Sequence, residues 1–186
     1  MTNRSEEFAA RFEEANNEFI ALIERLDETQ WRSRCSAEGW TVAQAACHLA
    51  EDHPVLADFA QLAADGKPLP DFTVEAVDQM NAEQAGRNAN ATKEQVIHLL
   101  RTNGAAAAAV VRGLTDAQLD NAISVPASHP FRVLENLPER LTSPIAIEAG
   151  LIGHFREHGA SILEAAFPAL TAHPAGAKEP ASQVPA

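Results

Sequence analysis

The stretch GWTVAQAACHLAEDH, residues 39–53, combines a helix start, an apolar helix face and a polar group on that face. Thr41 followed by Gln44 is a capping-box pattern, which predicts that a helix begins at this point. The positions predicted to face inward recur at helical spacing and are Ala45, His48, Asp52, Val55 and Phe59. The mid-helix imidazole among them is either an incidental core residue or one member of a binding site.

A second pair of inward-facing imidazoles lies in LIGHFREHGASI, residues 151–162. His154 and His158 are four residues apart on the same stripe as Leu151 and Ile162. Side chains at positions i and i+4 of a helix point the same way, with their Cβ atoms roughly 5 to 6 Å apart. This spacing suits one metal ion bound by two imidazole nitrogens, and neutral imidazole favours zinc, nickel, iron or copper over magnesium or calcium.

A third imidazole would turn this pair into a reactive metal site. His48 would complete a three-histidine face that leaves positions open for water or substrate. The predicted metal ligands are therefore His48, His154 and His158. The alternative is a helical bundle whose histidines are buried and hydrogen-bonded to carbonyl groups.

Two residues near His48 are candidates for catalytic or ligand-orienting roles. His53 lies about 140° round the helix from His48, so both side chains cannot point straight inward. Pro54 removes a helical hydrogen bond and is expected to kink the helix, which could aim Asp52 or His53 toward a pocket. We therefore name Asp52 and His53 as candidate catalytic residues. An exposed acid on a solvated face is the competing interpretation of Asp52.

Apolar residues at helical spacing predict four long helices, at about residues 5–26, 41–65, 92–113 and 143–167. The third repeats the capping-box pattern with Thr92 and Gln95, and the fourth begins with Ser143 as the expected cap and Pro144 in the first turn. Four such helices indicate an all-α protein, a four-helix bundle with long crossover loops.

The segments between and after these helices carry weaker signals. The connection over residues 65–91 has room for a short helix of its own, and the proline-rich segment 124–144 is expected to be an ordered loop rather than a strand. We assign residues 1–170 to one bundle domain. The Pro/Ala-rich tail, residues 171–186, is predicted to be disordered.

Composition excludes several classes of function. A formal net charge of −12 argues against binding to nucleic acid or to anionic lipid, which both need clustered basic residues. No run of about 18 apolar residues predicts a membrane span, and no signal-peptide pattern opens the chain. Two cysteines do not make a disulfide framework. A cytoplasmic location is the default expectation.

The joint order of these motifs resembles the DinB-like superfamily, which includes YfiT-type hydrolase-like proteins and the N-terminal domain of mycothiol-dependent maleylpyruvate isomerase. The resemblance rests on GWTVAQAACHLAEDH followed roughly a hundred residues later by HFREH, and on DFTVEAVDQMNAEQAGR, which is similar to an Asp-x-x-Asn stretch of the mycothiol-linked branch. It implies an up-down-down-up bundle with a divalent metal, often zinc or nickel. It also implies that His48, His154 and His158 hold the metal and that Asn81 lines the entrance as a cofactor-binding residue.

Two functions follow from this resemblance. The first is a metal-dependent enzyme that acts on a small-molecule substrate, either as an S-transferase with a low-molecular-weight thiol such as mycothiol or as a hydrolase. The second is a non-catalytic metal-binding or dimerising bundle, such as a stress-associated protein that pairs as a homodimer. The sequence leaves open which of them applies.

Overall fold

The computed structural model of the protein describes residues 3–130, 132 and 137–168. The tail predicted to be disordered, residues 171–186, lies outside this range. The elements in chain order are α1 (Arg4–Arg25), α2 (Glu28–Arg32), α3 (Val42–Ala64), α4 (Val74–Arg87), α5 (Lys93–Arg112), α6 (Asp116–Leu119), β1 (Ala122–Ser124), β2 (Arg140–Thr142), α8 (Ser143–Ile145), the π-helix η1 (Ala146–Ile152) and α9 (Gly153–Ala166).

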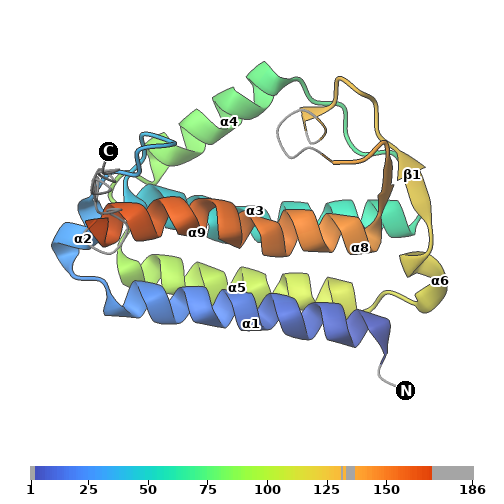
Figure 1. Ribbon diagram of the computed structural model, residues 1–186, viewed down its shortest axis with the longest axis horizontal. Helices are drawn as coiled ribbons and strands as arrows, with labels where there is room; N and C mark the ends of the chain where they lie inside the picture. Colours follow the sequence, from blue (N-terminus) through green and yellow to red (C-terminus); the bar gives the residue numbers. More distant parts are fainter. Residues whose placement is uncertain (1–2, 131, 133–136, 169–186) are drawn as a thin grey trace, which may run out of the picture.

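Four long helices lie side by side as a bundle: α1, α3, α5 and the continuous helix α8–η1–α9 (Figure 1). Helix α5 packs between α1 and α3, and α9 packs on α3 and α1. The first and last helices run in one direction and α3 and α5 in the other, which is the up-down-down-up order (Figure 1). Because α3 and α5 are parallel, the chain must cross back between them, and α4 lies in that crossover.

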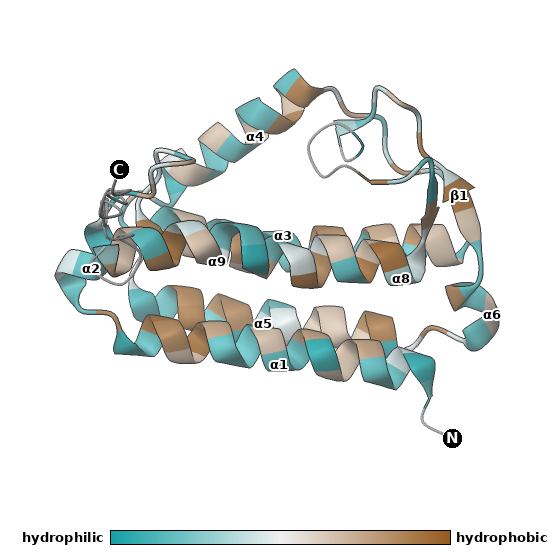
Figure 2. Ribbon diagram, viewed as in Figure 1, coloured by the Kyte–Doolittle hydropathy of each residue, from teal (hydrophilic) through white to brown (hydrophobic). Residues whose placement is uncertain are grey.

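The bundle is held by amphipathic faces. Figure 2 shows hydrophilic and hydrophobic residues alternating along each bundle helix, as expected when one face is buried. Among the side chains with essentially no exposed surface are Phe12, Trp31, Leu49, Leu100 and Ile147. No helix in the described part of the chain combines the length and the apolar character that crossing a bilayer requires.

The predicted capping boxes are confirmed at the starts of α3 and α5. In the first, the Gln44 backbone N–H donates to Thr41 Oγ1 at 3.2 Å, and the Thr41 N–H donates to Gln44 Oε1 at 2.8 Å. The Gln44 side chain also donates to the carbonyl of Ala85 at 2.8 Å. The cap that starts α3 therefore also holds the end of α4 beside it.

Three expectations about local structure were wrong. The segment 124–144 is not entirely loop, because Ile123 in β1 pairs with Leu141 in β2 and both side chains are buried. Thr142, not Ser143, caps the fourth helix, because the Ser143 hydroxyl is buried and donates to the carbonyl of Ala60 at 2.8 Å. Val55 does not face inward, since 47% of it is exposed.

The glycine in the middle of α5 is required by close packing against α1. A Cβ added at Gly104 would lie 2.4 Å from Nδ2 of Asn16, a buried side chain that donates to the Leu100 carbonyl at 3.0 Å. We expect Gly104→Ala to lower the free energy of unfolding by about 1–3 kcal/mol, because the added methyl must displace a buried hydrogen-bonded amide. Urea-induced unfolding followed by circular dichroism measures the change.

Gly159 in α9 is the matched control, because a Cβ there would meet nothing within 4 Å. Gly159→Ala should leave the stability unchanged or raise it by up to about 1 kcal/mol, as alanine is the better helix former. Equal effects of the two substitutions would contradict the packing explanation for Gly104.

Candidate metal centre

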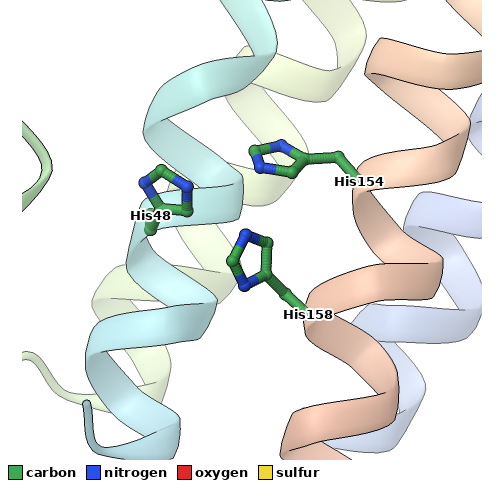
Figure 3. Close-up of side chains that lie close together, drawn as sticks. All are labelled: His48, His154 and His158. Carbon is green, nitrogen blue, oxygen red and sulfur yellow. The ribbon is translucent and has the colours of Figure 1, made fainter. Parts of the chain in front are cut away.

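Three histidine side chains converge between α3 and α9. His48 lies in the second turn of α3, and His154 and His158 lie one turn apart on α9. Their ring centroids are 4.7–5.0 Å apart, and one nitrogen from each ring lies within 4.8 Å of the others. Figure 3 shows the three rings pointing at one another from the two facing helices. The structure thus brings together the three residues predicted to be metal ligands.

The helix that carries two of these histidines has a wide turn just before them. Residues 146–152 form the π-helix η1, and His154 follows in the first turn of α9. Such turns hold an extra residue, so they change which face the following α-helix presents, and they are frequent at functional sites. The turn passes close to α3, because a Cβ added at Gly150 would touch Leu56 at 3.4 Å.

A carboxylate orients His158. Nδ1 of His158 lies 2.9 Å from Oε1 of Glu38, and the other carboxylate oxygen accepts a hydrogen bond from the Ser161 hydroxyl at 2.5 Å. Burial opposes ionisation of Glu38, but the hydrogen bonds from Ser161 and His158 outweigh it and lower the pKa of this carboxyl. An ionised carboxylate accepts the Nδ1–H, so Nε2 of His158 remains available as a ligand atom.

An amide orients His48 in the same way. Nδ1 of His48 lies 2.6 Å from Oε1 of Gln84, and because an amide oxygen only accepts, the imidazole donates from Nδ1. The amide nitrogen of Gln84 in turn donates to Oδ1 of Asp52 at 3.2 Å. The second oxygen of Asp52 lies 3.5 Å from Nε2 of His48, the nitrogen left free. Helix α4 is therefore connected to the centre through one glutamine.

One ring nitrogen of His154 is left unsatisfied by the described residues. Its Nδ1 is buried and has no hydrogen-bond partner among the described residues. Burial, together with the neighbouring His158 and His48, holds the pKa of His154 well below its usual value. Burial likewise lowers the pKa of His158. Neutral imidazoles are the form that binds metal, so the residues present fit a divalent ion of the zinc or nickel type.

A cavity of about 380 Å³ opens onto the three histidines. This volume is in the range of small-molecule sites. The wall includes Trp40 and Leu56 on the bundle side, and Val77, Asp78 and Asn81 on α4. Trp40 also packs on the centre, with its ring stacked on His158 at 6.3 Å between centroids. Asn81, expected at the entrance, does line this cavity; its role in binding a cofactor stays a prediction.

The two candidate catalytic residues lie in different environments. Asp52 lines the cavity and is 27% exposed, and burial raises the pKa of its carboxyl. His53 does not line the cavity. It is packed between the rings of Phe12 and Phe155, at centroid distances of 5.1 and 5.2 Å, and both its nitrogens are buried without a hydrogen bond to a described residue. The geometry thus favours a role at the centre for Asp52 over His53.

Sequence reasoning missed the groups that orient the histidines. Glu38 lies in the loop before α3, outside any periodic pattern, and Gln84 lies on a helix whose packing the sequence did not reveal. One sequence signal lies beside Glu38, namely the glycine that follows it. In the structure, Gly39 has a φ of 71° and forms the tight turn before α3. No local signal exists for Gln84.

A family profile matches residues 12–137, which is more than half of the chain. It is described as the mycothiol maleylpyruvate isomerase N-terminal domain. The chain belongs to this family, within the DinB-like superfamily. The matched range includes His48, Gln84 and Asn81, whereas His154 and His158 lie beyond it. No curated protein sequence matches the chain significantly.

Two solved structures are similar in fold. YfiT from Bacillus subtilis, described as "a probable metal-dependent hydrolase with an unusual four-helix bundle topology", has a TM-score of 0.65 and 20% identity, over 88% of this chain and 87% of YfiT. A histidine-to-alanine mutant of the mycothiol-dependent maleylpyruvate isomerase has a TM-score of 0.60 and 15% identity, over 89% of this chain. The match spans 63% of the isomerase chain.

The buried position of His53 predicts an acid-sensitive fold. Burial lowers the pKa of His53 from 6.5 to about 4, so between these values the unfolded chain binds a proton that the folded chain does not. Stability therefore falls as the pH drops from 6.5 toward 4, by up to about 3 kcal/mol from this residue. We expect His53→Leu to remove the share of the loss that comes from this residue, while the share of His154 and His158, whose pKa values burial also lowers, remains. Urea unfolding of the chelated protein between pH 4 and 7 measures the change.

His98→Gln is the control, because His98 is exposed on α5. This substitution should leave the pH dependence of the free energy of unfolding as it is in the natural chain. If the free energy of unfolding of His53→Leu changes with pH as it does in the natural chain, His53 is already charged in the folded protein.

Proposed function

We propose that the chain binds one divalent metal ion through His48, His154 and His158 and is an enzyme that acts on a small molecule in the adjoining cavity. The preferred reaction is S-transfer from a low-molecular-weight thiol, and hydrolysis is the second candidate. The observation that carries the proposal is the convergence of three imidazole nitrogens within 4.8 Å beside a cavity of about 380 Å³. A three-histidine face leaves a position open, which is typical of catalytic rather than structural zinc sites.

A metal ion at this position would lower the pKa of a thiol or water that reaches it. The chain's own residues orient the histidines and form the walls of the cavity. Glu38 and Gln84 fix the tautomers of His158 and His48, so both rings present Nε2 to the same point. Trp40 and Leu56 provide apolar walls that limit the access of water.

Asp52 is the group placed to take up the released proton. It lines the cavity, and its Oδ2 lies 3.5 Å from Nε2 of His48. Burial raises the pKa of its carboxyl, which brings it closer to the range in which a carboxylate works as a general base. In S-transfer the thiol proton would pass to Asp52, the sulfur would bond to an electrophilic carbon, and the leaving group would depart with the electron pair of the broken bond.

The comparisons support both reactions. The family is named after a mycothiol maleylpyruvate isomerase, which supports a role for a low-molecular-weight thiol, and the similar YfiT is described as a probable metal-dependent hydrolase, which supports attack by water. A non-catalytic metal-binding bundle is the competing function, and the activity assay below separates it from the enzyme.

Metal analysis tests the site itself. We expect about one divalent ion per natural chain, and a loss of most of it in His154→Ala and in His158→Ala. A His98→Ala control should retain the metal, because His98 is on the surface of α5. Since the ion would join α3 to α9, chelation should lower the melting temperature of the natural chain but not of the two variants. Unchanged metal content in both variants would remove the proposal.

Metal-dependent activity of the natural chain separates an enzyme from a metal-binding bundle, and Asp52→Asn tests the proposed base. If Asp52 is the base, the variant keeps its metal but loses about 10²- to 10⁴-fold in kcat for thiol transfer to an electrophilic acceptor. The assay uses several low-molecular-weight thiols, before and after chelation and with metal restored. Activity that survives chelation, or an Asp52→Asn variant with full kcat, would argue against this mechanism.

A further inference from the structure

The cavity beside the three histidines is acidic. Three carboxylates line it, those of Glu38, Asp52 and Asp78, and none of the described residues in its wall is Lys or Arg. Sites that recognise carboxylate or phosphate groups typically present arginine or lysine to them. Among the described residues, no arginine or lysine lines this cavity.

Two of the three carboxylates are already engaged. Glu38 accepts hydrogen bonds from His158 and Ser161, and Asp52 accepts one from Gln84 and lies beside His48. Their two negative charges match the charge of one divalent ion held by neutral imidazoles. A bound metal would therefore be locally compensated before any substrate enters.

Asp78 adds a charge that nothing in the site compensates. It lies on α4, is exposed, and makes no hydrogen bond or ion pair with another described residue. Asn81 lies three residues later, on the same side of the helix, and also lines the cavity. Together they present a carboxylate and an amide to whatever enters, a pair that suits ammonium or hydroxyl groups and repels anions.

We propose that this cavity selects neutral or cationic small molecules, such as amino- or hydroxyl-bearing thiols, and rejects those that carry a carboxylate or phosphate, with Asp78 as the specificity-determining residue. This inference rests on the proposed function, because it concerns the molecule that reaches the three-histidine centre. It concerns binding, so it requires no assumption about the reaction that follows.

The test measures binding of three small thiols to the cobalt(II)-loaded protein through the thiolate-to-cobalt absorption band. Cysteamine is cationic, 2-mercaptoethanol is neutral and 3-mercaptopropionate is anionic. We expect the affinity for thiolate to fall in that order. A single charge facing the ligand across several ångströms corresponds to about a three- to tenfold difference per step, which should shrink at high salt.

Variants of Asp78 assign the effect to this residue. Asp78→Asn should reduce the preference for cysteamine over 3-mercaptopropionate by about three- to tenfold, and Asp78→Lys should reverse it. Comparing each variant with the natural chain cancels the intrinsic differences between the thiols. Glu83→Gln is the matched control, because it removes one negative charge from the same helix at a residue that does not line the cavity, and it should leave the preference unchanged.

These measurements separate a failure of the charge selectivity from a failure of the proposed function. Equal binding of all three thiols, or tighter binding of 3-mercaptopropionate, overturns the selectivity while leaving the metal site intact. The same holds if Glu83→Gln changes the preference as much as Asp78→Asn does. If the protein binds no cobalt, the proposed metal site fails. If no thiol produces the band, the preferred thiol transfer fails. The inference fails in either case.

Discussion

Burial of three imidazoles at one level of the bundle is the constraint on which the rest of the site depends. His48 and His154 face each other between α3 and α9, where an unsatisfied polar nitrogen is costly. Glu38 accepts a hydrogen bond from Nδ1 of His158, and Gln84 accepts one from Nδ1 of His48, so these two nitrogens are satisfied. Nδ1 of His154 is left without a partner among the described residues. Such a set is satisfied by a common ligand more readily than by further hydrogen bonds, which is why we interpret it as a metal centre.

The groups that orient these rings also explain the unusual connection of the bundle. Parallel α3 and α5 require a crossover, and α4 lies in it (Figure 1) and lines the cavity beside the centre. Two glutamines fasten it there: Gln44, from the α3 cap, donates to Ala85 of α4, and Gln84, from α4, accepts from His48. The same helix carries Asp78 and Asn81. One crossover thus completes the histidine environment and forms the wall that a substrate would meet.

The three carboxylates of the cavity fall into two groups. Glu38 and Asp52 lie against the imidazoles and match the charge of a divalent ion. Asp78 lies on α4, is exposed and makes no ion pair with another described residue, so in our proposal it acts on the charge of the incoming molecule. In this proposal, selection by charge and activation by metal depend on different residues. His53 lies in the apolar core beneath, packed between two phenylalanines.

The sequence by itself determined the four helices, two of their caps and the three histidines, because helical periodicity and capping are local rules that hold before the chain folds. It also placed Asp52 one turn from His48. Only the tertiary structure decided that Glu38 and Gln84 orient the rings, that His53 lies in the core, and that β1 and β2 pair. These contacts join residues between 16 and 120 positions apart, and no local pattern encodes which distant side chain arrives. The direction of a buried polar group is therefore set by packing, and the sequence shows only that the group is there.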